Sequence, residues 1–396
     1  MAERVYLDWN ASAPLRSEAR TAMLAALEAV GNPSSVHGEG RAARRLVEEA
    51  RAKVAALVGA EARNVVFTSG GTEANALALT PSITTVQTKM PRDRLMVSAI
   101  EHPSVRSGGR FPAGTVEEIP VDAGGIVNLE QVEARLAAPT AQGACRPLVS
   151  IMHANNETGV VQPVARAAAI VHAAGGLLHV DAVQSAGRIS CDINAIGADL
   201  VTLSSHKMGG PKGIGALVTG GAAILIADPL IKGGGQERGA RAGTENVAAI
   251  AGFGAAAEAA ARDLAPDGAR AAALRARLEQ GIAAISPGVV FFGQTSERLP
   301  NTTLFAVSGI KAETALIALD LDGIAVSSGA ACSSGKVKAS HVLAAMGVDP
   351  ALGRGALRLS LGATTTEHEV DVFLKAWIKL CKSLSKGAKE RRGLAA

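Results

Sequence analysis

The sequence lacks the residue spacings that hold metal ions or disulfides. Its four cysteines form no CxxC pair, and its eight histidines form no HxxxH or HExxH pair. Scattered cysteines in a long chain are typical of neither a secreted disulfide framework nor a zinc site. We therefore predict no bound metal and a reducing compartment. The cysteines are Cys145, Cys191, Cys332 and Cys381.

Aromatic residues, an excess of one charge and long apolar runs are also scarce. Aromatics make up 3% of the 396 residues, and 40 Lys and Arg stand against 36 Asp and Glu. Without a basic field or stacking side chains, we expect no nucleic-acid partner. The N-terminus carries Glu3 and Asp8 but no apolar signal segment, and no apolar run reaches membrane-spanning length. We predict a soluble, cytoplasmic protein without a membrane partner.

The sequence does contain short β-branched runs that alternate with alanine-rich segments of helical length. This alternation is typical of an α/β fold around a mostly parallel sheet. Helices are expected at 72–79, 128–137, 163–174 and 246–262. Strands are expected at 64–69, 94–100, 115–121, 147–153, 176–182 and 198–205.

The residue pattern changes near residue 263, where the alanine-rich helical segment ends and the turn-like segment DLAPDG begins. We predict a domain boundary there, followed by a smaller α+β unit with a C-terminal helix from 366 to about 385 and a frayed, solvated tail. Strands of this unit are expected within 298–307, 322–332 and 354–362.

Polar residues follow the predicted strands of the sheet. Ligands of open α/β sheets bind outside the carboxyl ends of the strands, so these residues form the candidate site. Asp181 ends one strand, and Lys207 follows the next. Burial lowers the pKa of a lysine and makes it suitable for an imine. A lysine beside a Gly-rich turn is equally typical of a surface side chain, but a strand-end aspartate favours a pyridoxal phosphate (PLP) site, where Asp partners the ring nitrogen and Lys forms the Schiff base.

The remaining strand-end residues have natural places around such a cofactor. Gly71 and Thr72 open a helix whose free N–H groups suit a phosphate, together with Ser204 and His206. The other expected places are Gln184 and Asn156 near the phenolic oxygen, and His102 over the ring face. A NAD site is excluded, because no predicted strand is followed by GxGxxG with an acid about 20 residues later.

Ten motifs in order resemble those of the PLP-dependent cysteine desulfurases of the class V aminotransferase superfamily, closest to the group of iron–sulfur cluster assembly and nitrogenase maturation. They run collinearly from about residue 5 to 365. They are YLDWNASAP, GNPSSVHGEG, FTSGGTEAN, EHPSV, HANNETGVV, HVDAVQSAG, SSHKMGGPKGIGAL, GGGQERGARAGTEN, SSGAACSSG and LRLSLG.

The resemblance implies a fold-type I PLP-dependent transferase and a homodimer. We expect a large PLP-binding domain over 14–262 and a small domain from 1–13 and 263–396. By the matching motifs Lys207 is the Schiff-base lysine, Asp181 pairs with the pyridine nitrogen, and His102 stacks on the ring. Thr244 matches the threonine that reaches the other subunit's cofactor, and Arg358 matches the arginine that holds the substrate carboxylate, with Asn156 beside it.

The same resemblance implies that L-cysteine is converted to L-alanine through a PLP ketimine, leaving a persulfide on Cys332. Small residues surround Cys332 in SSGAACSSGK, as a sulfur carrier needs. The sulfur would pass to an acceptor such as an iron–sulfur scaffold protein. The C-terminus departs from the family members that dock a scaffold, so the acceptor stays open. Alternatives are a selenocysteine lyase, a cysteine sulfinate desulfinase, a transaminase or a non-catalytic scaffold.

Overall fold

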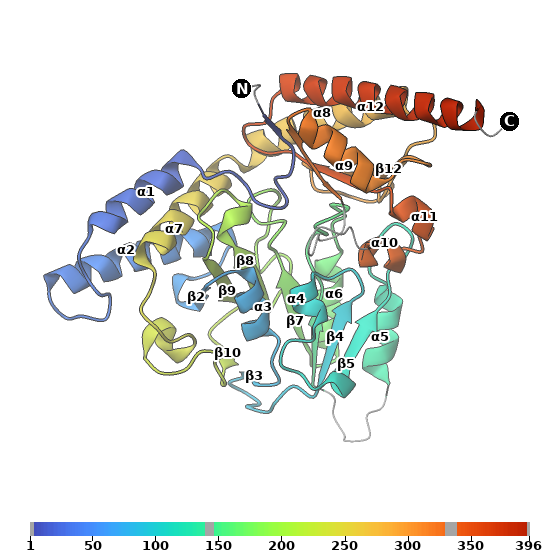
Figure 1. Cartoon of the computed structure of the whole chain (residues 1–396). Helices are drawn as coiled ribbons and strands as arrows, with labels where there is room; N and C mark the ends of the chain where they lie inside the picture. The colour runs from blue at the N-terminus through green and yellow to red at the C-terminus, as the bar shows by residue number, and fades with distance from the viewer. Residues whose placement is uncertain (1–3, 139–145, 329–338, 394–396) are drawn as a thin grey trace.

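The computed structural model describes residues 4–138, 146–328 and 339–393. Its centre is a seven-stranded sheet in which the two strand pairs that involve β9 are antiparallel and the others are parallel (Figure 1). The predicted mostly parallel sheet is therefore confirmed. In spatial order the strands are β2 (Val65–Thr68), β9 (Gly215–Thr219), β8 (Leu200–Ser204), β7 (Leu177–Asp181), β6 (Pro147–Ser150), β4 (Arg94–Ser98) and β5 (Val116–Ile119).

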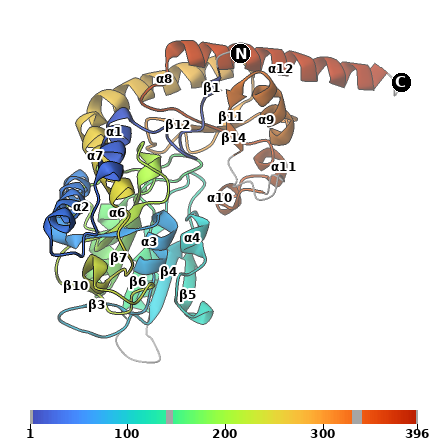
Figure 2. The ribbon, with the colours of Figure 1, turned by 60° about the vertical axis from the view of Figure 1, so that its left-hand side comes forward.

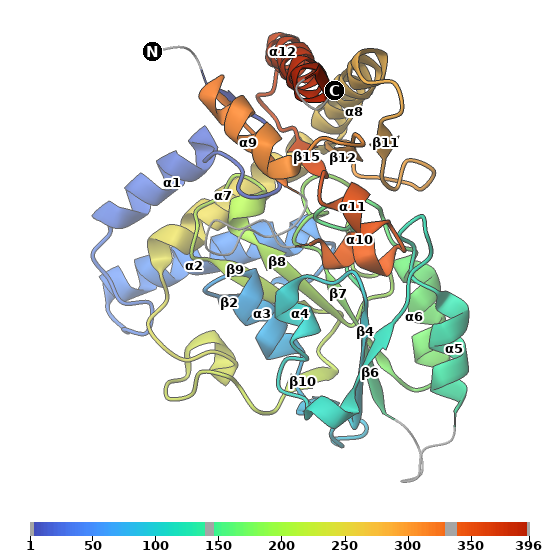
Figure 3. The ribbon, with the colours of Figure 1, turned by 45° about the vertical axis from the view of Figure 1, so that its right-hand side comes forward.

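Helices cover both faces of this sheet, which is why its inner strands are apolar at successive positions. On β8, Val201 and Leu203 pack into one core cluster, while Leu200 packs into another on the opposite face. The first face carries α2 (Gly38–Leu57), α5 (Leu129–Ala137), α6 (Val164–Ala173) and α7 (Val247–Arg262). The second carries α3 (Gly71–Ala78) and α4 (Pro103–Arg106), which stand in front of the strands in Figure 3.

The smaller unit is built on a four-stranded antiparallel sheet. Its core contains Phe305 and Trp377, whose rings meet edge to face at 5.3 Å. The strands, in order, are β11 (Val290–Phe291), β12 (Thr302–Ala306), β15 (Leu357–Ser360) and β14 (Ser327–Ser328). The helices are α8 (Leu264–Ile285), α9 (Ala312–Leu321) and α12 (Glu367–Gly393), and α12 projects beyond the rest of the molecule (Figure 2).

The N-terminal segment belongs to the smaller unit through main-chain hydrogen bonds. Strand β1 (Val5–Tyr6) pairs in parallel with β13 (Ile324–Ala325). The following residues run on toward the large sheet, because the N–H of Trp9 donates to the carbonyl of Ser360 and the N–H of Ala13 donates to the carbonyl of His206. One segment thus bridges both units.

The second unit differs from the sequence expectations in three details. The turn-like segment DLAPDG is helical: α8 begins at Leu264, and Pro266 lies in its first turn, where a missing N–H costs nothing. The C-terminal tail is helical to Gly393 instead of frayed after about 385. The strand expected at 322–332 is divided into β13 and β14 within the part that the structure describes.

The other elements lie around these two sheets. Among the described residues, no helix is long and apolar enough to cross a membrane. The remaining elements are α1 (Ser17–Glu28), α10 (His341–Ala345), α11 (Pro350–Gly353), the pair β3 (Ile83–Thr85) and β10 (Ile224–Ile226), and the 3-10 turns η1 (Ala62–Asn64), η2 (Ala113–Thr115), η3 (Ser205–Lys207) and η4 (Gln236–Gly239).

Candidate active site

A cavity of about 570 Å³ lies at the carboxyl ends of the central strands. It is closed on one side by the start of α3 and on another by the N-terminal segment at Ala11 and Ser12. Nine of the predicted site residues line it, although they come from five separate stretches of sequence. They are Gly71, Thr72, His102, Asn156, Asp181, Gln184, Ser204, His206 and Lys207.

Lys207 ends the short turn η3 directly after β8. Its ammonium donates to the main-chain carbonyls of Asn10 at 2.6 Å and Ala11 at 3.0 Å. Burial, followed by the positive charges of Arg188 and Arg358, lowers the pKa of Lys207 to about 8. A sizeable fraction of the amine is therefore neutral near pH 8, as an imine-forming lysine requires.

Asp181 is the last residue of β7 and is 5% exposed. The amide of Asn75 donates to one carboxylate oxygen at 2.9 Å, and the main-chain N–H of Val183 donates to the other at 3.0 Å. Asn75 is itself fixed, because it accepts from the hydroxyl of Thr202 at 2.7 Å. The carboxylate is thus held in one orientation and keeps lone pairs for a further donor.

The start of α3 forms the opposite end of the cavity. A side chain on Gly71 would meet Val183 at 3.0 Å and Ser204 at 3.3 Å, so only glycine lets the helix approach β8 this closely. The first N–H groups of a helix have no partner within the helix and favour an anion. His206, beside Ser204, has a pKa lowered to about 4, chiefly by burial, and contacts the hydroxyl of Ser12.

Gln184 is held by Arg188, a partly buried residue that was not among the predicted site residues. Arg188 donates to the side-chain oxygen of Gln184 at 2.5 Å and to its carbonyl at 2.9 Å. It also donates to the carbonyls of Trp9 and Lys207, each at 3.3 Å. The amide nitrogen of Gln184 is therefore turned the other way, toward the carbonyl of Asn10 at 3.1 Å.

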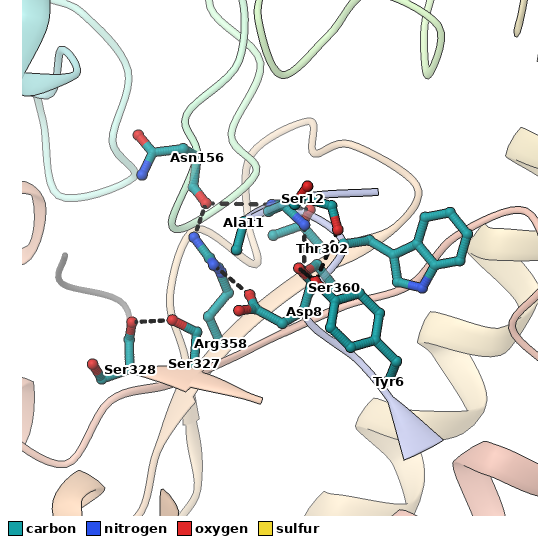
Figure 4. Close-up of polar contacts among 12 residues, drawn as sticks. Tyr6, Asp8, Ala11, Ser12, Asn156, Thr302, Ser327, Ser328, Arg358 and Ser360 are labelled. Carbon is teal, nitrogen blue, oxygen red and sulfur yellow. Dashed lines mark hydrogen bonds and ion pairs between the residues drawn. The ribbon is translucent and has the colours of Figure 1, made fainter. Parts of the chain in front are cut away.

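Arg358 lies on β15 and is separated from the cavity wall. One terminal nitrogen donates to the carboxylate of Asp8 at 2.6 Å, and the other donates to the main-chain carbonyl of Asn156 at 2.9 Å (Figure 4). The structure therefore brings Arg358 behind Asn156 and does not place it among the residues that line the cavity.

Two more predicted site residues are not among the described residues that line this cavity. Thr244 is exposed and lies away from its wall. Cys332 lies outside the described residues, as does Cys145. Cys191 is buried, and burial raises the pKa of its thiol to about 12, so this thiol is inert.

The sequence analysis missed five residues that support the site: Asp8, Asn10, Asn75, Glu101 and Arg188. Each lies in or next to a quoted motif, but its partner is distant in sequence, so only the fold identifies it. Glu101 is fully buried and accepts from the N–H of Met152 at 2.5 Å. Burial, followed by the negative charge of Asp181, raises the pKa of Glu101 well above its usual range.

Comparisons with known proteins agree with this geometry. The chain matches the aminotransferase class-V family over residues 5–373. A cysteine desulfurase of Cereibacter sphaeroides is 44% identical over 379 residues, which cover 94% of each chain. The cysteine desulfurase IscS of Dictyoglomus turgidum is 39% identical over 97% of this chain and 96% of its own. The solved structure of a NifS-like protein from Rickettsia africae ESF-5 matches with a TM-score of 0.84 and 34% identity, covering 96% of this chain and 100% of that chain.

The chain therefore belongs to the aminotransferase class-V family and is a pyridoxal-phosphate-dependent enzyme. The cavity fits that cofactor on its own chemistry: a lysine of lowered pKa, an oriented carboxylate, and a glycine-lined helix start surround one space. The predicted fold class and cofactor are confirmed.

Proposed function

We propose that the protein is a cysteine desulfurase, which converts L-cysteine to L-alanine and retains the sulfur as a persulfide. The observation that carries this proposal is the cavity shared by Lys207, Asp181 and His102, in a chain whose relatives carry that name over nearly their whole length. In the overall step the C–S bond of the substrate breaks and an S–S bond to Cys332 forms. The electron pair of the broken bond, with a proton, goes to the carbon of alanine.

Bound pyridoxal phosphate supplies an aldehyde for amine capture and a ring that accepts the electrons of the substrate Cα–H bond. Lys207 would hold the cofactor through its amine, and that amine would move the Cα proton once the substrate amine has taken its place. Asp181 would keep the ring nitrogen protonated, because its carboxylate is fixed by Asn75 and Val183. His102, on the wall of the same cavity, would stack on the ring and move a proton at the substrate.

The other cavity residues bind the cofactor. The N–H groups at the start of α3, with Thr72, Ser204 and His206, would hold the phosphate. Gln184 and Asn156 would bind the phenolic oxygen, and Asn156 would also contact the substrate carboxylate. The hydrogen bond from Arg188 supports this orientation of Gln184.

Arg358 binds the substrate carboxylate, and Cys332 attacks the substrate sulfur. Two neighbouring contacts support this pairing. Ser327 lies directly across from Arg358 in the small sheet, and β14 ends at Ser328 (Figure 4). In the sequence, Cys332 follows the end of this strand by four residues.

A homodimer completes the site, with Thr244 of each subunit at the other's cofactor phosphate. Thr244 is exposed in the single chain, as this role requires. Large apolar side chains on and after α1 are also exposed, which favours an interface between copies. They are Leu24 at 57%, Leu27 at 68%, Val30 at 85% and Val36 at 88% exposure.

The domain division at residue 263 has support in the packing, since α7 and α8 contribute to different core clusters. The large domain covers 14–262, and the small domain covers 1–13 and 263–396. In this proposal the enzyme works in the cytoplasm and delivers sulfur to a protein acceptor, such as an iron–sulfur scaffold.

Two linked measurements test the proposal. The purified protein with pyridoxal phosphate is expected to show a visible absorption band that L-cysteine changes, and to release alanine. Mass spectrometry should then find one added sulfur on the peptide of Cys332. Cys332→Ala should abolish the added sulfur and sulfide release, while Cys381→Ala, the matched control, should retain both.

Absence of alanine from L-cysteine would overturn the desulfurase proposal. Undiminished activity of Cys332→Ala on selenocysteine or cysteine sulfinate, with none on L-cysteine, would favour those alternative substrates. The sedimentation mass, with Leu27→Asp as the interface variant, tests the homodimer.

A further inference from the structure

Both terminal nitrogens of the Arg358 guanidinium form hydrogen bonds within the chain itself. Both terminal nitrogens, which would grip a carboxylate end-on, are engaged by Asp8 and by the carbonyl of Asn156. The side chains of Arg358 and Asp8 are only 7% and 20% exposed, so this ion pair is largely shielded from water. The remaining nitrogen, Nε, is buried without a hydrogen-bond partner.

Asp8 is held in place by its own main chain. The hydroxyl of Tyr6 donates to the carbonyls of Asp8 at 3.1 Å and Ser12 at 2.8 Å. Asp8 also forms a parallel bridge with Ser360, two residues beyond Arg358 on the same strand (Figure 4). The carboxylate thus reaches Arg358 from a fixed backbone, and only rotation of side chains can separate the two groups.

The same segment touches the reactive lysine. Asn10 and Ala11 supply the two carbonyls that accept from the Lys207 ammonium. A seven-residue stretch, 6–12, therefore contacts both the amine and the guanidinium. Each terminal nitrogen of Arg358 already donates to one of these groups, so a substrate carboxylate that binds both terminal nitrogens end-on competes with Asp8 and with the carbonyl of Asn156 for them.

We propose that Asp8 is a specificity-determining residue: its carboxylate holds Arg358 in the free enzyme and is exchanged for the carboxylate of the incoming substrate. This inference rests on the proposed function. The exchange replaces one charge-assisted hydrogen bond by another, so the net gain from the substrate carboxylate is reduced by the cost of releasing Asp8. An amine without a carboxylate cannot make the exchange.

The first test compares Asp8→Asn with the wild type on two thiols. L-cysteine carries the carboxylate and cysteamine lacks it. Asp8→Asn removes the competing charge, so KM for L-cysteine should fall by about tenfold, the worth of one charged hydrogen bond. Affinity for cysteamine, measured from the cofactor absorption, should stay unchanged. Asp320→Asn is the matched control, because Asp320 forms an equally short but exposed pair with Arg4 in the same unit.

The second test needs no cofactor. Phenylglyoxal, which modifies accessible guanidinium groups, is applied to cofactor-free protein, and the Arg358 peptide is quantified by mass spectrometry. Modification of Arg358 should be faster in Asp8→Asn and in Asp8→Ser than in the wild type or in Asp320→Asn. Circular dichroism establishes whether each variant is folded. If Asp8→Asn does not fold, the comparison is made with Asp8→Ser.

An unchanged or raised KM for L-cysteine in Asp8→Asn, or equal phenylglyoxal rates in all folded variants, would overturn the exchange. A raised KM would mean that Asp8 keeps the guanidinium oriented while the substrate is bound. Failure of the proposed function is a separate result, namely that the wild type releases no alanine from L-cysteine. The phenylglyoxal comparison then still decides whether Asp8 covers Arg358.

Discussion

The two sheets contribute to the active site in different ways. In the large sheet, functional side chains stand at or just after the ends of strands: Asp181 ends β7, and Lys207 follows β8. In the small sheet, Arg358 stands within β15 and lies behind Asn156, with its two terminal nitrogens bound to Asp8 and to the carbonyl of Asn156. The carboxyl ends of parallel strands lie at the same edge of the sheet, so the residues that follow them come close together. A side chain in the middle of an antiparallel strand is instead oriented by the residues that it contacts.

The difference also separates two tasks. The large sheet holds the cavity-lining groups that are proposed to bind the cofactor, and their positions follow from one sheet covered by helices on both faces. The small sheet and the N-terminal segment hold the groups proposed to meet the substrate carboxylate. Substitutions in the large sheet should therefore mainly lower kcat, whereas substitutions in the small sheet should mainly raise KM for the substrate.

The largest expected effect comes from removing the amine of Lys207, which follows a strand of the large sheet. Lys207→Ala should lower kcat by about 10³-fold or more, because it removes both the covalent holder and the proton carrier. The protein should still bind pyridoxal phosphate without the absorption band of the lysine adduct. Steady-state alanine production and absorption spectra measure both. Lys53→Ala, a surface lysine paired with Glu258, is the control and should behave as the wild type.

A smaller effect is expected from the small sheet. Arg358→Lys keeps the charge but loses the planar fork, so KM for L-cysteine should rise by about 10²-fold. The cofactor absorption band should stay unchanged, and kcat should fall much less than KM rises. Arg354→Lys, on the exposed turn before β15, is the control. Loss of cofactor binding in Arg358→Lys would contradict the division of tasks between the sheets.

The smallest expected effect is a shift in pH dependence. The pKa of Lys207 is lowered to about 8, so the neutral, nucleophilic amine increases as pH rises through that value and levels off above it. The rate of pyridoxal phosphate capture by cofactor-free protein should follow this curve. Arg188→Gln removes the largest charge contribution to the lowered pKa. The midpoint should then move to higher pH by roughly 0.5–1 unit.

Arg358→Lys offers an internal comparison for this measurement. It retains a positive charge near Lys207, so the midpoint for cofactor capture should stay near pH 8. An equal shift in both variants would mean that the pKa depends on the shape of the site rather than on the charge of Arg188.

The large sheet and its site residues could be predicted from the sequence more fully than those of the small sheet, because strand ends are visible in the sequence and the partners of a mid-strand side chain are not. All six predicted strands of the large sheet are present, and every strand-end residue selected for the cofactor lines one cavity. Arg358, in contrast, was selected only through the family resemblance, because a strand arginine carries no local sign of its partner. Its position behind Asn156, and its pairing with Asp8 at the opposite end of the chain, could not be read from spacing.

The sequence by itself determined the α/β fold, the edge of the sheet that forms the site, and the pairing of a strand-end lysine with a strand-end aspartate. Periodicity and strand ends can be recognised locally in the sequence, and a parallel sheet brings the residues at its strand ends together at one edge. Only the tertiary structure decided what holds each group: Asn75 on Asp181, Arg188 on Gln184, and the N-terminal segment on both Lys207 and Arg358. The contacts of Asn75 and of the N-terminal segment join residues far apart in sequence. Arg188 is only four residues from Gln184, but it is also held by the carbonyl of Trp9, so this arrangement too exists only once the chain has folded.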